Sequence, residues 1–372
     1  MKIVYALAII SGTSIGVGFF ILPYVTLKVG FWVILGYFLF LGSLTVLINL
    51  FFGELALKTP DFKRLPGFAK IYLGKWGQGL AYISTVLGML GALLVYLIVG
   101  GEFLTELVSP IFGGSLLAYT LLYFIAGALF IFFGIKAIAK VEFWGLLLFF
   151  LILFIIFFQG KSFLTVGNLF PVPDNAFLFL PYGIILFSLW GVTMIPEVEE
   201  MLGEKRNLLL KIIPFAVLIP IIVYLFFIYV ILGITGPQTT ESALGGLKNV
   251  LGNGIVSLAL CFGILTTFTS FIALGLTLKN VFHFDLKLGK TLSWTITCFC
   301  PLILFLIGIK SFITIIALIG GVMLGIEAIL ILLMRRKLYF KLKESSIKCL
   351  LIYPLILIFL VGIIYEIIYF VK

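Results

Sequence analysis

The sequence predicts an all-α integral membrane protein with eleven transmembrane helices. Of its 372 residues, 63% are hydrophobic and only 11% are charged, whereas soluble domains carry about 25% charged residues. Apolar runs recur along the whole chain, and many approach the roughly 20 residues that a helix needs to cross a bilayer. The two halves of the chain also share one pattern, which predicts an inverted repeat of five plus five helices followed by an extra eleventh.

Short connections with charged residues, glycine or proline separate the apolar segments. The predicted spans are residues 3–27, 31–55, 78–107, 116–133, 141–159, 179–200, 212–235, 251–279, 291–309, 311–334 and 349–371. No linker or change in composition divides the chain, so we expect a single transmembrane domain over residues 1–372. Its first repeat covers about 1–160, its second about 161–335, and the extra helix about 349–371.

The first span is unusual because Ser11–Pro23 interrupts its apolar run with three glycines, two further hydroxyl residues and a proline. Glycine costs about 1 kcal/mol in a helix interior and proline about 3 kcal/mol. Backbone groups freed by a broken helix find no water in hydrocarbon, so the break must face protein or a wet cavity. It therefore predicts a binding site, with free N–H donors and carbonyl acceptors. Close helix packing through small residues is the alternative.

The next four spans complete the first half. After the second span, the segment 56–77 contains two prolines and is expected to form a cytoplasmic connection with a short helix. The third span, 78–107, is long enough to tilt across the bilayer or to protrude from it. The fourth and fifth spans are shorter and carry no comparable break.

The sixth span repeats the break of the first. Gly191 and Pro196 are five positions apart, as are Gly18 and Pro23, and the two pairs are offset by 173 residues. The same offset brings the third, fourth and fifth spans onto the eighth, ninth and tenth. Because five spans is an odd number, the two halves enter the membrane from opposite sides. Inverted repeats with a broken first helix in each half are typical of secondary transporters.

The basic residues set the expected orientation. With the N-terminus inside, the cytoplasmic segments hold 20 Lys and Arg residues and the outer segments hold 5. This positive-inside asymmetry predicts a multi-pass protein of the cell (plasma) membrane with its N-terminus in the cytoplasm and its C-terminus outside. The formal net charge of +10 is thereby explained by topology, and no nucleic-acid partner is expected.

Three stretches resemble the amino acid–polyamine–organocation superfamily. Residues 12–24 (GTSIGVGFFILPY) resemble its first-helix motif, residues 187–197 (FSLWGVTMIPE) its broken sixth helix, and residues 269–285 its eighth helix. The tryptophan/tyrosine permeases and the amino acid/auxin permeases are the most similar groups. The resemblance implies a secondary active amino acid transporter, a symporter working by alternating access, with a neutral, large apolar or aromatic substrate.

An amino acid needs donors for its carboxylate and acceptors for its ammonium group. The N–H groups from Ser14 to Gly18 suit the carboxylate, and the carbonyls around 10–12 and 187–189 suit the ammonium. The resemblance implies the same division. The predicted substrate-binding residues are Gly12, Thr13, Ser14, Ile15, Gly16, Gly18, Phe187, Ser188, Trp190 and Gly191.

Two kinds of coupling ion remain open. The resemblance implies a sodium site made by the Thr269 and Ser270 hydroxyls with the carbonyls of Gly12, Ile15 and Thr266; helix hydroxyls that bond back to their own helix are the alternative. Buried carboxylates are the candidates for proton coupling, because an ionisable group within a span is a functional hypothesis. Glu327 is the best placed, and Glu102 lies toward the outer end of the third span.

Other functions fit less well. A carrier of cationic amino acids or polyamines needs an acidic pocket, and only Glu327 is near the midplane. A non-transporting amino acid sensor on this fold stays open. An intramembrane enzyme needs paired catalytic groups at membrane depth, yet the aspartates and the one histidine lie in connections: Asp61, Asp174, Asp285 and His283. No enzyme activity, no metal site and no cofactor are expected beyond a sodium ion, and the expected partners are the substrate and membrane lipid, with no obligate protein partner.

Overall fold

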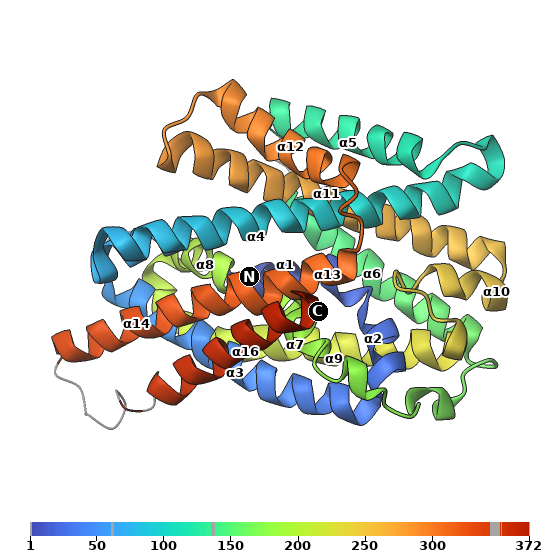
Figure 1. Cartoon of the computed structure of the whole chain (residues 1–372), viewed down its shortest axis with the longest axis horizontal. Helices are drawn as coiled ribbons and strands as arrows, with labels where there is room; N and C mark the ends of the chain where they lie inside the picture. Colours follow the sequence, from blue (N-terminus) through green and yellow to red (C-terminus); the bar gives the residue numbers. More distant parts are fainter. Residues whose placement is uncertain (1, 61–62, 135–137, 343–349, 351, 372) are drawn as a thin grey trace.

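The computed structural model describes residues 2–60, 63–134, 138–342, 350 and 352–371, and within them the chain is helical with no strand. The longer helices are α1 (Lys2–Ser14), α2 (Leu22–Val29), α3 (Phe31–Lys58), α4 (Leu65–Phe112), α5 (Leu116–Phe133), α6 (Ile138–Gly160), α7 (Pro181–Leu189), α8 (Ile195–Leu202), α9 (Leu209–Thr235), α11 (Asn253–Asn280), α12 (Lys290–Leu306), α13 (Phe312–Leu318), α14 (Leu324–Leu342) and α16 (Ile352–Val371). They run side by side along one axis of the molecule (Figure 1).

Shorter helical turns join these elements. They are the 3₁₀ turns η1 (Val17–Phe19), η2 (Val166–Leu169), η3 (Asn175–Phe177), η4 (Val192–Met194), η5 (Gly203–Leu208), η6 (Gly236–Gln238) and η7 (Gly245–Leu247), the short helix α10 (Lys248–Leu251), and the π-helical turns η8 (Val281–Asp285) and η9 (Ile319–Met323). Each apolar segment of the sequence coincides with one or more helices. The described part contains seven helices long and apolar enough to cross a membrane, or eight if one bent pair counts as a span, so the number eleven and the inverted repeat stay predictions.

Both predicted breaks are present. The first separates α1 from η1 and α2, with a bend of 54° between Ile3–Ser14 and Val17–Val29, and Gly16 adopts an extended conformation there. The second separates α7 from η4 and α8 at Trp190 and Gly191. A third interruption was not predicted: the π-helical turn η9 divides the expected tenth span into α13 and α14.

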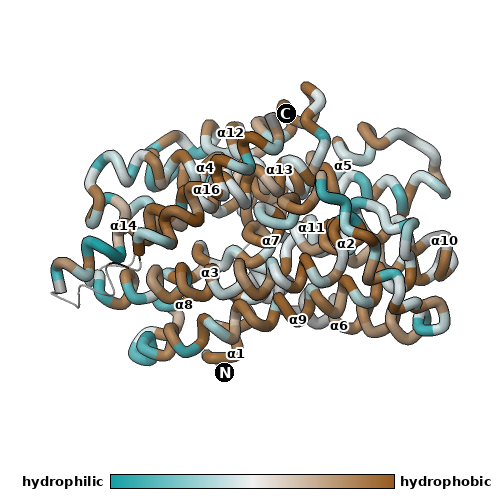
Figure 2. The backbone as a smooth tube through the Cα atoms, turned by 60° about the horizontal axis from the view of Figure 1, so that its bottom comes forward, coloured by the Kyte–Doolittle hydropathy of each residue, from teal (hydrophilic) through white to brown (hydrophobic). Residues whose placement is uncertain are grey.

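The connections gather at the two ends of the bundle. In Figure 1 the start of α4, helix α8 and the end of α14 lie at one end, and α10 and the turn between α4 and α5 lie at the other. The backbone is hydrophobic along most of the helices and hydrophilic at the turn near α8 and the end of α14 (Figure 2). Helix α4 bends at Gly74, whose φ is +79°, so residues 65–73 form the short helix expected in the segment 56–77.

Aromatic side chains close the centre of the bundle on the α10 side. Phe19 and Phe20 follow the first break, and their ring centroids lie 4.8 Å from Phe227 and 5.0 Å from Phe103, respectively. All four rings are buried. Rings at these distances in edge-to-face arrangements are attractive. We call Phe19, Phe20, Phe103 and Phe227 the aromatic cluster.

Candidate functional site

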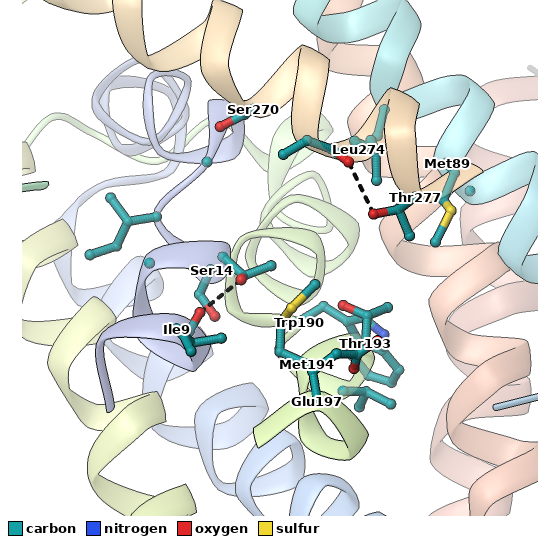
Figure 3. Close-up of a pocket in the computed structure, with 18 of the residues that line it drawn as sticks. Ile9, Ser14, Met89, Trp190, Thr193, Met194, Glu197, Ser270, Leu274 and Thr277 are labelled. Carbon is teal, nitrogen blue, oxygen red and sulfur yellow. Dashed lines mark hydrogen bonds between the residues drawn. The ribbon is translucent and has the colours of Figure 1, made fainter. Parts of the chain in front are cut away.

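A cavity of about 890 Å³ occupies the centre of the bundle. Helix α1 forms one wall, α4 and α11 form others, and the second broken span and α14 complete it. Figure 3 shows Ser14, Ser270, Met89 and Trp190, which come from four of these elements, arranged around the same space. The cavity therefore meets both breaks of the chain.

The cavity reaches the surface at one end of the bundle. Its mouth lies at the end of the bundle where α4 starts and is lined by the exposed residues Tyr5 and Arg64, with Glu197 and Asp285. Arg64 Nε lies 3.3 Å from Glu197 Oε1. Trp190, Glu327 and Phe262 also line the cavity and are buried. By the predicted topology, the mouth faces the cytoplasm, and the aromatic cluster closes the opposite side.

Five of the predicted binding residues in the first break line the cavity together: Gly12, Thr13, Ser14, Ile15 and Gly16. The Thr13 and Ser14 hydroxyls donate to the carbonyls of Ile9 and Ile10, at 2.7 and 3.2 Å. A Cβ atom on Gly16 would lie 2.6 Å from the Tyr96 hydroxyl. Gly16 thus lets the Tyr96 side chain approach the break, which explains why this position lacks a side chain.

In the second break, Phe187 and Trp190 line the cavity. The other predicted residues lie beside it. A Cβ atom on Gly18 would lie 2.5 Å from Ser188 Oγ, and one on Gly191 would lie 2.9 Å from Ile10 Cγ2. The Ser188 hydroxyl donates to Ile184 O at 2.8 Å. Gly18, Ser188 and Gly191 therefore bring the two breaks together and are not in the cavity lining.

A tyrosine that the sequence did not indicate joins the two breaks. The Tyr224 hydroxyl, on α9, donates to Ser188 O at 2.8 Å and lies 2.5 Å from Ser14 O. Tyr224 is fully buried. A hydroxyl has a single proton, so the two carbonyls share it. One side chain thus contacts a backbone carbonyl at each of the two helix breaks.

The residues of the predicted sodium site all line the cavity: Gly12, Ile15, Thr266, Thr269 and Ser270. The Thr269 hydroxyl donates to Thr266 O at 3.1 Å, the back-bonded arrangement that was the alternative. The Thr266 hydroxyl oxygen is buried without a hydrogen-bond partner. The five residues thus line one space, and their assignment to sodium stays a prediction.

Glu327 lines the cavity and is 2% exposed. Its Oε1 accepts from the Thr85 hydroxyl at 2.8 Å, and its Oε2 accepts from Trp190 Nε1 at 3.0 Å. Both donors are neutral, and within the described residues no basic side chain pairs with it. Glu327 therefore links α14 to α4 and to the second break. The sequence did not indicate Thr85, because one threonine in an apolar helix carries no distinctive signal.

Glu102 is not brought together with the other candidates. It lies on α4 beside Glu106 and Glu241, near the closed end of the bundle, and does not line the cavity. Glu54, near the end of α3, forms an ion pair with Arg335 of α14, whose side chain is 6% exposed. No cluster of metal-ligating side chains occurs among the described residues.

The comparisons with known proteins agree with this architecture. Mhp1, a nucleobase-cation-symport-1 family transporter in a closed conformation with bromovinylhydantoin bound, is 15% identical over 88% of this chain and 76% of its own, with a TM-score of 0.66. MhsT in complex with L-phenylalanine is 15% identical over 99% and 97%, with a TM-score of 0.63. The Eremococcus coleocola manganese transporter is 12% identical over 99% and 94%, with a TM-score of 0.57.

At these identities the solved structures show a shared transporter fold. A search of curated proteins finds no match. A family model described as the tryptophan/tyrosine permease family matches residues 1–369, nearly the whole chain. This agrees with the resemblance seen in the two broken spans and with a permease, not an enzyme. The chain belongs to the tryptophan/tyrosine permease family.

Proposed function

We propose that this permease is a secondary active transporter that moves a neutral, large apolar or aromatic amino acid by alternating access. The observation that carries the proposal is the single cavity that reaches both helix breaks. A cavity of about 890 Å³ lies within the roughly 300–1,000 Å³ range of small-molecule sites. It is closed by the aromatic cluster on one side and open on the other, as one state of an alternating-access cycle requires.

The polar part of the site suits an amino acid backbone. Gly12 and Gly16 line the cavity and have no side chain of their own, which favours contact between a substrate and main-chain groups. Neither break buries a charged side chain in the cavity wall, so a zwitterion would be held by backbone dipoles and hydroxyls. The family description, which names tryptophan and tyrosine, and the L-phenylalanine bound by MhsT support this class of substrate.

The remaining lining suits an apolar or aromatic side chain. Met89, Phe187, Phe262 and Leu265 come from three different helices and face the cavity. Burying apolar area contributes about 25 cal/mol per Å². A cationic substrate would need a free acidic partner. Of the carboxylates that line the cavity, Glu327 accepts two hydrogen bonds, Glu197 pairs with Arg64, and Asp285 lies within electrostatic range of Arg64. The geometry therefore favours a neutral substrate over a polyamine or a cationic amino acid.

Glu327 is the proposed proton-coupling group. As a carboxylate, Glu327 accepts hydrogen bonds from both Thr85 and Trp190. Once it is protonated, one of its oxygens carries the proton and becomes a donor, so the hydrogen bond that this oxygen now accepts is weakened. Burying an unpaired charge is costly, so the site favours binding of a proton. Proton binding would thus change the contact that orients Trp190 at the cavity. Substrate and proton then influence each other's affinity through this one residue.

Sodium is the alternative coupling ion, on Thr269, Ser270 and the nearby carbonyls. The two ions are separated by uptake into proteoliposomes under independently imposed proton and sodium gradients. We expect labelled tryptophan, tyrosine or phenylalanine to accumulate under one gradient, and lysine and putrescine to be excluded. A chain that binds these amino acids but accumulates none of them under either gradient would be a sensor and would contradict the proposal.

A glycine pair provides a matched control for the site. Gly16→Leu places a side chain against the Tyr96 hydroxyl and is expected to abolish uptake. Gly36→Leu, on the exposed face of α3, meets nothing within 4 Å of its Cβ position and should transport normally. Both variants should reach the membrane in similar amounts. Uptake by Gly16→Leu at the wild-type rate would refute the placement of the site.

A further inference from the structure

A second buried carboxylate lies outside the cavity. Glu366 is on α16, five residues before the end of that helix, and is 0% exposed. Neither of its carboxylate oxygens has a hydrogen-bond partner among the described residues. No ion pair of the described residues includes it. The extra helix therefore carries an acidic group into an interior that offers it no opposite charge.

The carboxyl group packs directly on the π-helical turn η9. A Cβ atom on Gly321 would lie 2.6 Å from Glu366 Cγ, 2.8 Å from Cδ and 2.9 Å from Oε2. Helix α16 also contacts α13 and α14. The contact leaves no space beside Glu366 on this side, and the residue does not line the central cavity. A proton fits such a site, whereas a metal ion with several oxygen ligands does not.

The titratable groups that face Glu366 are tyrosines. Tyr37 of α3, Tyr182 of α7 and Tyr369 of α16 lie within electrostatic range of its carboxylate, and Tyr365 precedes it on α16. Helix α13 and the turn η9 hold no titratable side chain. The first charged residue of α14 after η9 is Glu327, whose carboxylate accepts from Thr85 and Trp190 instead. None of these groups offers a positive charge.

A tyrosine hydroxyl supplies a hydrogen-bonding group nearby. The Tyr182 hydroxyl is buried and has no hydrogen-bond partner in the part of the chain that the structure describes. It lies against Gly362, one helical turn before Glu366. A protonated carboxyl and a hydroxyl can satisfy each other, because each donates and accepts. A carboxylate in the same place would keep an uncompensated charge in a dry interior, which costs several kcal/mol.

We propose that Glu366 is a proton-binding site, separate from Glu327, and that its protonated form lets α16 pack on η9. The contact continues into the second broken span. Gly320, next to Gly321, packs backbone to backbone on Gly183 of α7, with no side chain between them. Loss of the Glu366 proton would disturb the packing of α16 on Gly321. Because Gly320 is adjacent, this would also disturb its contact with Gly183, which positions α7 and its residue Phe187.

Infrared spectroscopy of the purified full chain, recorded without substrate across a pH titration, tests this proposal. We expect a protonated-carboxyl C=O band that Glu366→Gln removes and that Glu327→Gln, the matched control, leaves in place. Because only the folded state holds this proton, the unfolding temperature of the wild type should fall as the pH rises. In Glu366→Gln, which is neutral at every pH, that fall should be smaller. A spectrum and a pH profile identical to those of the wild type would overturn the proposal.

A second variant covers the case in which Glu366→Gln is not recovered folded. Gly321→Ala places a methyl group against the carboxyl of Glu366 and leaves its proton in place. Its C=O band should persist and shift in frequency. An unshifted band in Gly321→Ala would show that the titrating carboxyl is not the one packed on η9. None of these measurements uses transport, so a failure here is distinct from a failure of the proposed function.

Discussion

Replacing Tyr224 with phenylalanine removes the one hydroxyl that joins the two helix breaks. The ring itself should stay in place, because it stacks on Phe19 at 6.2 Å with an interplanar angle of 10°. Ser14 O keeps the N–H of Gly16 as a donor, at 2.8 Å. Ser188 O, at the end of α7, loses the bond from Tyr224. The variant therefore isolates the effect of one buried carbonyl that loses its hydroxyl donor.

The magnitude follows from the cost of that carbonyl. A buried acceptor left without a donor costs about 1–3 kcal/mol. At about 1.4 kcal/mol per factor of ten, the state that contains the bond becomes about 5- to 140-fold less favoured. If the bond belongs to the state with the open cavity, Tyr224→Phe will depopulate that state by this factor. If the bond is present throughout the transport cycle, the loss will appear as lower thermal stability.

Labelling of a cysteine at the cavity mouth measures the open state. In a background without the four native cysteines, Thr277→Cys places a thiol in the cavity lining of α11. We expect its reaction with a water-soluble thiol reagent to slow in the Tyr224→Phe variant, or the unfolding temperature to fall. Tyr229→Phe is the control, because Tyr229 is on the same helix and its hydroxyl forms no hydrogen bond in the described structure. A Tyr224→Phe protein with unchanged labelling and unchanged stability would refute the reasoning.

Three further results are expected. Glu327→Gln replaces one carboxylate oxygen with an amide donor. Uptake by this variant should no longer be stimulated by a proton gradient, while counterflow of substrate continues. Stimulation at the wild-type level would exclude Glu327 as the coupling group. Glu54→Gln removes the partly exposed carboxylate that pairs with Arg335, so the free energy of unfolding should fall by about 1.5–3 kcal/mol, the contribution of a hydrogen bond to a charged group. The fall is measured by thermal unfolding in detergent and compared with Glu200→Gln, which alters an exposed carboxylate. Gly183→Ala, whose new methyl group would meet the backbone of Ala317, should lower folded yield far more than Gly79→Ala, which meets nothing within 4 Å; equal yields would contradict the close packing of α7 on α13.

The sequence reveals the two breaks because their cause is local. Glycine and proline within an apolar run interrupt a helix wherever the rest of the chain lies, so Ser11–Pro23 and Gly191–Pro196 could be recognised without knowing what they contact. The function of each glycine depends on distant residues. Gly16 and Gly18 look alike in the sequence, yet one lies in the cavity lining and the other packs on Ser188.

The residues that reasoning from sequence missed act over long separations. Tyr224 is one tyrosine in an apolar helix, and nothing in its neighbourhood shows that its hydroxyl reaches Ser14 and Ser188. The ion pair of Glu54 and Arg335 joins residues almost 300 positions apart. Glu366 did carry a signal, because an acidic residue in an apolar span is a functional hypothesis by itself. That no basic side chain of the described residues pairs with it became visible only with the packing of α16.

The two ends of the cavity are held by different forces, and so different conditions act on them. The Arg64–Glu197 pair at the mouth is exposed, and ions at physiological strength screen such a pair over about 8 Å. The aromatic cluster has no charge to screen, but its apolar contacts weaken on cooling. Raising the salt concentration should therefore affect the mouth alone, whereas lowering the temperature should loosen the aromatic closure. Ionic strength and temperature thus offer separate experimental control over the two sides of one transport pathway.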